Sequence, residues 1–253
     1  MDWVREEKHV HVDKISIHFG VTPQTIRRDI KRLCDEGLLR RHYGGVSLPV
    51  TLNLPRISDS ASAIEIFYQI IARQIAQLIP NGASVSLAGG DAVVYVAKAL
   101  LKHDSLKVLT NSLAVASALS SNSDLEVIVS GGQYRHADND MVGPEVTNFF
   151  SSFFSDYGII SAGSIDPVHG LMDYDIREAE ANRAVISNTR TKILLADQDK
   201  WEKSAMCKVA TFKYIDMFFT DRLPDEIVNK LPKTLEIFES NLVRTGSLSL
   251  GEG

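Results

Sequence analysis

Between residues 84 and 238 the chain alternates short apolar runs with segments in which apolar residues recur at helical spacing. The apolar runs are continuous, which is typical of strands buried on both faces of a parallel sheet. This rhythm predicts an α/β domain over residues 61–240, which opens with a helix from Ala61 that stops before Pro80. The expected strands are Ser84–Ala88, Leu106–Thr110, Glu126–Ser130, Tyr157–Ser161, Lys192–Ala196, Met217–Thr220 and Thr234–Phe238.

The segment Thr22–Leu33 (TPQTIRRDIKRL) has a different pattern, with apolar and basic residues on opposite sides of one helix. Thr22 suits the capping position, and Pro23 suits the first helical position, where no backbone donor is needed. At about 100° per residue, Ile26 and Ile30 share one side of the helix. The opposite stripe carries Gln24, Arg27, Arg28 and Lys31.

The flanking segments complete a winged helix-turn-helix over residues 1–47. Residues 12–19 read as a short helix that ends at Gly20, directly before Thr22, and residues 1–7 read as the first helix of the module. Residues 38–46 read as two short strands about a Gly44-Gly45 turn, which is the expected wing. The alternation His-Val-His-Val over residues 9–12 favours a short strand paired with the wing over a metal pair.

A basic helix with an amide near its start has the chemistry needed to enter the DNA major groove. Arginine binds phosphates or guanine edges, and the amide of glutamine matches an adenine edge. A solvated surface helix is the alternative, and the adjacent turn and wing favour DNA binding. The expected DNA-binding residues are Thr22, Gln24, Thr25, Arg27, Arg28 and Lys31 on the helix, and Arg40, Arg41 and His42 on the wing.

The charge distribution supports this division of the chain. The formal net charge is −5, which does not suit a general nucleic-acid binder. Residues 1–47, however, carry nine Lys or Arg against seven Asp or Glu, and within residues 23–41 the count is six against three. The basic charge is therefore concentrated on the expected reading helix and wing, as in a sequence-selective module.

Glycine and polar residues follow the expected strands. In parallel α/β sheets ligands bind beyond the carboxyl ends of the strands, where glycines let backbone N–H groups approach an anion and a lysine adds a full charge. A small phosphorylated ligand suits such an edge, although turns of this composition are common in α/β folds. The segments concerned are Gly89-Gly90-Asp91, Asn111-Ser112, Gly131-Gly132, residues 163–166, and Asp197 with Lys200.

The run FGVTPQTIRRDIKRLCDEGLLRRHYGGVSLP closely resembles the N-terminal signature of DeoR-family bacterial transcriptional regulators. The resemblance continues through LTNSLAVASAL, VSGGQYR, VGPE, EAEANRAVI and LLADQDKW. It implies a sensor domain similar in fold to ribose-5-phosphate isomerase and the CoA-transferases. It also implies a phosphorylated sugar or polyol effector, for example glycerol 3-phosphate. Carried over by position, the effector site comprises Gly90, Asp91, Ala92, Asn111, Ser112, Gly132, Ser164, Asp166 and Lys200, with Tyr174, Asp175 and Glu178 closing it.

Three positions depart from the family pattern. The phosphate loop, usually Asp-Gly-Gly-Thr-Thr-Thr, reads AGGDAV over residues 88–93, so hydroxyl donors are lost and Asp91 adds a negative charge. A Gly-Ala-Asp-Gly segment is replaced by SAGS over residues 161–164, and a usual lysine is Asn182. Either Asp91 points away from the ligand, or the effector differs from the usual one, because like charges about 4 Å apart repel by about 4 kcal/mol at an effective dielectric constant near 20.

The most consistent interpretation is a repressor of carbohydrate or polyol genes that binds operator DNA as a homo-oligomer, dimer or tetramer, and is released by its effector. An isomerase-like enzyme using Asp166, Glu178 and Lys200 is one alternative, and a constitutive DNA-binding protein with a degenerate effector site is another. No cofactor, metal, catalytic residue or membrane segment is expected. Two cysteines without metal spacing fit the cytoplasm. Residues 48–60 are expected to be a linker and residues 241–253 a loose tail.

Overall fold

The computed structural model describes residues 9–35, 39–42, 45–47 and 63–240. The chain divides into two compact units, residues 1–53 and 54–253. The predicted first helix over residues 1–7, the predicted linker over residues 48–60 and the predicted tail over residues 241–253 lie outside the described residues. None of the described helices combines the length and the apolar character needed to cross a membrane.

The N-terminal unit has the expected helix-turn-helix and wing. Helices α2 (Val12–Phe19) and α3 (Pro23–Asp35) are joined by a turn at Gly20, whose φ of 63° favours glycine. Strands β2 (Arg40–His42) and β3 (Gly45–Ser47) form an antiparallel hairpin, and β1 (His9–His11) pairs with the other edge of β3. The predicted strand at residues 9–11 is therefore confirmed. The small core of this unit consists of Val10, Val12, Ile15, Ile26, Ile30, Leu39 and Val46.

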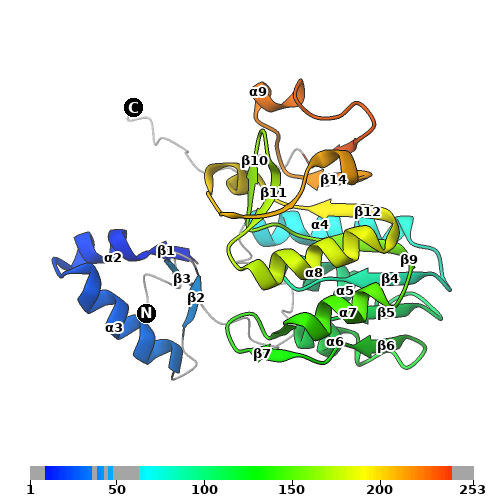
Figure 1. The fold of residues 1–253 in the computed structure, drawn as a ribbon, viewed down its shortest axis with the longest axis horizontal. Coiled ribbons are helices and arrows are strands. Elements are labelled where there is room, and N and C mark those ends of the chain that lie inside the picture. The colour runs from blue at the N-terminus through cyan, green and yellow to red at the C-terminus, as the bar shows by residue number, and fades with distance from the viewer. Residues whose placement is uncertain (1–8, 36–38, 43–44, 48–62, 241–253) are drawn as a thin grey trace, which may run out of the picture. The chain divides into compact units, whose positions relative to one another are not determined.

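The second unit is built on a parallel sheet with the strand order β15-β14-β12-β9-β4-β5-β6 (Figure 1). All seven predicted strands are present in it. The chain enters at the interior strand β4, builds outward to β6, and crosses back to place β9 on the other side of β4. The strand order reverses at this point, which is where ligands bind in open α/β sheets. The strands are β4 (Ser84–Leu87), β5 (Lys107–Thr110), β6 (Glu126–Val129), β9 (Ser155–Ile160), β12 (Thr189–Leu195), β14 (Met217–Thr220) and β15 (Glu236–Glu239).

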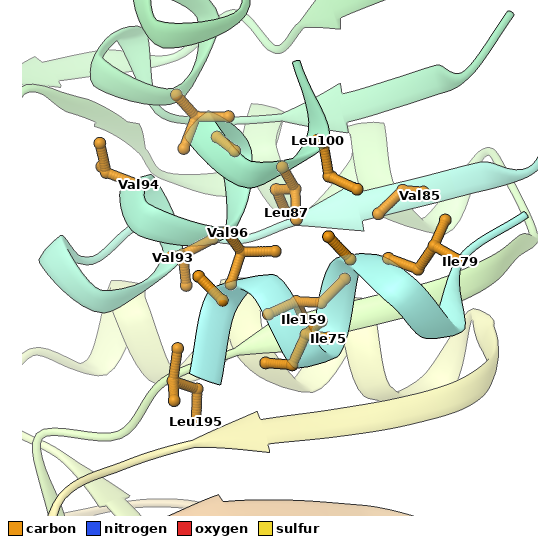
Figure 2. Close-up of a cluster of buried hydrophobic side chains, with 14 of the residues drawn as sticks. Ile75, Ile79, Val85, Leu87, Val93, Val94, Val96, Leu100, Ile159 and Leu195 are labelled. Atoms are coloured by element: carbon orange, nitrogen blue, oxygen red, sulfur yellow. The ribbon is translucent and has the colours of Figure 1, made fainter. Parts of the chain in front are cut away.

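Helices cover both faces of this sheet. Successive strand residues point in opposite directions, so apolar strands present an apolar surface on each face, and helices bury both surfaces. Ile159 belongs to the apolar cluster on one face and its neighbour Ile160 to the cluster on the other. Figure 2 shows the first cluster, where Ile75 and Val96 approach Leu87 of the sheet. The helices of that face are α4 (Ala63–Leu78), α5 (Asp91–Leu100) and α6 (Leu113–Leu119), and those of the other are α7 (Pro144–Ser151) and α8 (Ile176–Ser187).

Two small antiparallel elements that the sequence pattern did not predict lie among these layers. Strands β7 (Gln133–Arg135) and β8 (Asp140–Val142) form a hairpin after β6. Strands β10 (Ser164–Asp166), β11 (Gly170–Asp173) and β13 (Cys207–Ala210) form a three-stranded sheet. Both elements supply side chains to the edge where the parallel strands end.

Candidate DNA-reading helix and effector site

Helix α3 has the two faces that the sequence predicts. Thr22 Oγ1 accepts a hydrogen bond from the Thr25 backbone N–H (3.3 Å), so the predicted cap forms. Ile26 and Ile30 are 7% and 4% exposed and pack in the core of the N-terminal unit. The exposed face of this reading helix carries Gln24, Thr25, Arg27, Arg28 and Lys31.

The backbone of Arg40, Arg41 and His42 forms β2, the outer strand of the wing. Arg41 pairs with Val46 across the hairpin. The predicted turn includes Gly44, which lies outside the described residues. The wing therefore has the predicted topology, and its contacts with DNA remain a prediction.

In the second unit, the loop after β4 is closely packed around its two glycines. A Cβ atom on Gly89 would lie 2.7 Å from Asp140 Oδ2, and one on Gly90 would lie 2.5 Å from Ser161 Oγ. Gly90 also has a φ of 127° and precedes the first turn of α5. Both positions therefore require glycine, because polar groups from the β7–β8 hairpin and from the residue after β9 approach the loop.

Arg135 connects the loop to helix α8. Its Nε and Nη2 atoms donate to both oxygens of Asp140 (2.9 and 2.8 Å), and its Nη1 atom forms an ion pair with Glu178. Asp138 lies 3.2 Å from Nη2. The guanidinium is therefore fully engaged by carboxylates, and Asp140 itself is only 2% exposed.

A second set of contacts leads from Glu178 back to the loop. Glu178 shares a side-chain hydrogen bond with Asp173. Asn182 Nδ2 donates to Asp173 Oδ2 (2.9 Å) and lies 3.4 Å from the Ser161 carbonyl oxygen. Ser161 in turn lies against Gly90, so the contacts close on themselves. We call this set the polar ring; it consists of Gly89, Gly90, Arg135, Asp140, Ser161, Asp173, Glu178 and Asn182.

The carboxyl groups of Asp173 and Glu178, which face each other in the polar ring, both have raised pKa values. Burial and the nearby charge of Asp173 raise the pKa of Glu178 to about 8. Burial also raises the pKa of Asp173 to about 6, although hydrogen bonds from Asn182 and Glu178 oppose that shift. Because two ionised carboxylates cannot hydrogen-bond to each other, the pair shares a proton near neutral pH.

Asn111 and Ser112 follow β5 and lie under the β7–β8 hairpin. Asn111 Nδ2 donates to the Met141 carbonyl oxygen (2.8 Å), and Ser112 Oγ caps α6 by accepting from the Val115 N–H (3.3 Å). Both residues are almost completely buried. Asn111 Oδ1 is buried and accepts no hydrogen bond from the residues that the structure describes.

Lys200 stands on the short helix η1 (Gln198–Glu202), which directly follows β12. Asp197 positions this helix, since its side chain accepts from the Asp199 N–H (3.0 Å) and from the Tyr68 hydroxyl. Lys200 acts electrostatically on both Asp173 and Lys203. The charge of Lys200 lowers the pKa of Asp173, against the larger effect of burial, so Lys200 lies on the side of η1 near the polar ring.

The other predicted effector residues differ in their surroundings. Ser164 is buried in β10, Tyr174 lies against Gly163, and Gly132 adopts a φ of 131° before β7. Ala92 packs in the apolar core, so only its backbone N–H suits a ligand. Asp166 accepts from the backbone N–H groups of residues 168 and 169 at the tip of the β10–β11 hairpin, and this turn function gives no support to an effector role.

Sequence reasoning missed three central members of the polar ring, namely Arg135, Asp140 and Asp173. Arg135 stands in the VSGGQYR segment that carries the family resemblance, so a signal for it existed. Asp140 and Asp173 lie on short antiparallel strands with no clear periodicity. Asn182, noted as a departure from the family, is the hydrogen-bond donor to Asp173.

A winged helix-turn-helix joined to an α/β unit with polar groups at its strand ends defines a transcriptional regulator with a sensor domain. The model of the DeoR-like helix-turn-helix domain matches residues 1–51, and that of the DeoR C terminal sensor domain matches residues 68–222. The chain belongs to the DeoR family of DNA-binding transcriptional regulators.

Several relatives match over most of their length. The glycerol-3-phosphate regulon repressor of Escherichia coli (strain K12) is 35% identical over 88% of this chain and 89% of its own. The repressor of the same name from Haemophilus influenzae is 34% identical, and the match covers 90% of this chain and 89% of that protein. The HTH-type transcriptional repressor CsqR of Escherichia coli (strain K12) is 32% identical, and the match covers 87% of this chain and 85% of that protein. The chain thus groups with transcriptional repressors and not with enzymes.

Solved structures give a more distant likeness. Ribose 5-phosphate isomerase A from Methanocaldococcus jannaschii is 11% identical, with a TM-score of 0.40, over 54% of each chain. The expected neighbour is therefore found, at a level that supports no conclusion about activity.

Proposed function

We propose that this protein represses genes of carbohydrate or polyol metabolism and leaves its operator when a phosphorylated sugar or polyol binds at the polar ring. The polar ring carries this proposal, because it gathers buried hydrogen-bonding groups at the strand ends where α/β sheets bind ligands. The relatives named as repressors of a glycerol-3-phosphate regulon make glycerol 3-phosphate the first effector to test.

Regulation requires that the effector and the operator favour different states of the protein. A homo-oligomer, dimer or tetramer, would hold two or more reading helices at the spacing of repeated half-sites. Effector binding would favour an arrangement with another spacing, and operator affinity would fall by the ratio of effector affinities for the two states. These events belong in the cytoplasm, where the operator and phosphorylated metabolites meet.

Arg28→Ala should weaken operator binding, because Arg28 lies on the exposed face of the reading helix beside Arg27. If Arg28 binds a phosphate, the slope of log affinity against log salt concentration should fall by about one unit. If it binds a base edge, specificity should relax at one operator position instead. Fluorescence anisotropy at several salt concentrations measures both, with Arg73→Ala on α4 as the control. Wild-type affinity and salt slope would refute the assignment of the reading helix.

Glycerol 3-phosphate should raise the thermal unfolding midpoint of the full-length protein. A ligand at about one hundred times its dissociation constant stabilises the folded state by about 2.7 kcal/mol. A panel of other sugar phosphates and the unphosphorylated counterparts should be measured beside it, together with operator release. A shift without operator release would separate ligand binding from regulation, and no shift with any ligand would contradict the proposed effector class.

A further inference from the structure

One hydrogen bond connects the edge where the parallel strands end to the first helix of the second unit. Asp197 lies two residues after β12, and its Oδ2 atom accepts from the Tyr68 hydroxyl in the second turn of α4. Burial, and then the charge of Asp197, raise the pKa of Tyr68 well above its usual value of 10, so the hydroxyl stays protonated and is the donor. A hydrogen bond to a charged acceptor is stronger than a neutral one.

The same carboxylate also holds the short helix η1. Asp197 Oδ1 accepts from the Asp199 N–H (3.0 Å), and the Asp197 carbonyl oxygen accepts from the Lys200 N–H (3.1 Å). Asp197 is only 5% exposed, and each of its carboxylate oxygens accepts a hydrogen bond within the protein. Asp197 therefore ties η1 to α4, and a shift of η1 would strain or break the hydrogen bond with Tyr68.

The observed position of η1 also has a cost. Trp201, on the same short helix, stacks on Phe212 with ring centroids 5.9 Å apart. Its Nε1 atom is buried and has no hydrogen-bond acceptor among the residues that the structure describes. A buried donor without a partner is costly, so a displacement of η1 that pairs this N–H would be favourable. The Tyr68–Asp197 hydrogen bond thus holds η1 in a position that the Trp201 side chain by itself disfavours.

Helix α4 is the part of the second unit that is nearest in sequence to the DNA-reading unit. It is the first helix after the wing, and residues 48–62 separate it from the end of β3. Tyr68 stands in the N-terminal half of α4. The hydrogen bond from Asp197 therefore connects the ligand edge to the helix that continues, through the chain, to the reading helix.

Resting on the proposed function, we propose that the Tyr68–Asp197 hydrogen bond is a regulatory contact: it stabilises the operator-binding state, and effector binding at the strand ends shifts η1 and breaks it. Tyr68 then affects regulation without contacting the operator or the effector. A ligand shifts an equilibrium only by its differential affinity for the two states, so loss of a bond that belongs to one state changes the balance directly.

Tyr68→Phe removes only the hydroxyl, because the ring stacks on Tyr95 of α5 with centroids 5.6 Å apart. The full-length variant should release the operator at a half-maximal effector concentration at least about fivefold below that of the wild type, since the operator-binding state has lost one charge-assisted hydrogen bond. Its operator affinity without effector should be no higher than that of the wild type. Tyr214→Phe, an exposed tyrosine on η2 (Phe212–Tyr214), is the matched control and should change neither value.

Fluorescence anisotropy measures this release on an operator fragment that the wild-type protein selects from random DNA, with thermal midpoints as the check on folding. The effectors are glycerol 3-phosphate and a panel of other sugar phosphates. A merely structural hydroxyl would loosen η1 when removed and raise the effector concentration that is needed, so the sign of the change separates the two roles. An unchanged or higher half-maximal concentration in Tyr68→Phe would overturn the inference and leave the proposed function intact. If no probe releases the operator from the wild type, the proposed function fails, and the inference fails with it.

Trp201 supplies a second readout that needs no substitution at Tyr68. The chain has two tryptophans, so a Trp3→Phe background leaves Trp201 as the only one. The effector should change the Trp201 emission over the concentration range in which it releases the operator. Tyr68→Phe in the same background should move this range to lower concentrations. An emission spectrum that saturating effector leaves unchanged would show that η1 keeps its position, which contradicts the inference.

Discussion

Replacement of Arg135 by methionine is expected to lower the free energy of unfolding by about 3–5 kcal/mol. Methionine keeps much of the side-chain volume but removes the positive charge. Asp140, which is 2% exposed, would then be a buried carboxylate without its two charge-assisted hydrogen bonds. Removing one partner of a buried pair is far more costly than removing an exposed ion pair, which is typically worth less than about 1 kcal/mol.

Urea unfolding followed by circular dichroism measures this change. Arg73→Met, an exposed substitution on α4, is the matched control and should alter stability by less than about 0.5 kcal/mol. Combining Arg135→Met with Asp140→Asn should recover part of the loss, because the stranded carboxylate is then neutral. An Arg135→Met variant as stable as the control would show that Asp140 does not depend on this guanidinium.

The parallel sheet could be predicted because its strands are buried on both faces and read as continuous apolar runs. Strand β14, for example, places Phe218 in one core cluster and Phe219 in the other. The β7–β8 hairpin could not be predicted in this way. It is three residues long on each side, and its buried Asp140 is satisfied by Arg135 and not by an apolar face. The pattern of hydrophobic residues carries no information about such a pair.

Residues of the candidate site could be predicted from the sequence where they lie just beyond the end of a predicted parallel strand. Asn111 follows a predicted strand directly and Lys200 stands four residues beyond the end of another, and both lie at the expected edge. Asp173 ends a short antiparallel strand that pairs with β13 more than thirty residues later, and its contact with Asn182 comes from the packing of the following helix α8 and not from a strand end of the parallel sheet. Asp166 shows that a polar residue beyond a strand can also serve its own turn, because its Oδ1 atom accepts from the backbone N–H groups of residues 168 and 169; its effector role stays a prediction.

Asp173 and Asn182 also connect two of the departures from the family pattern. Gly163, where the resemblance leads one to expect an acidic residue, donates its backbone N–H to Asp173 Oδ1 (3.1 Å). Asn182, where the resemblance leads one to expect a lysine, donates to Oδ2 of the same carboxyl group. Both departures therefore affect the same carboxyl group. Each oxygen of Asp173 still accepts a hydrogen bond, one from the Gly163 backbone and one from the Asn182 side chain.

Raising the pH from 5 to 8 is expected to destabilise the wild-type protein through the Glu178 and Asp173 pair. In the unfolded chain Glu178 has its ordinary pKa of 4.5, whereas in the fold burial and the Asp173 charge raise the pKa to about 8, although Arg135 opposes the shift. Between these values the folded state holds a proton that the unfolded state has released. The proton on Glu178 therefore adds to the free energy of unfolding. This stabilisation is fully present below about pH 4.5 and is lost as the pH rises through 8, and the loss between pH 5 and 8 is on the order of 3 kcal/mol.

Glu178→Gln should remove most of this pH dependence, because glutamine stays neutral and keeps a hydrogen-bond donor for Asp173. The difference in unfolding free energy between variant and wild type, from urea unfolding at pH 5, 6, 7 and 8, isolates the contribution of this residue from all other titrating groups. The difference should grow in favour of the variant as the pH rises. Asp173→Asn should act in the same direction, because Glu178 then loses the neighbouring charge that helps to hold its proton. A difference that stays constant from pH 5 to 8 would show that Glu178 is ionised in the folded protein throughout this range and does not share a proton with Asp173.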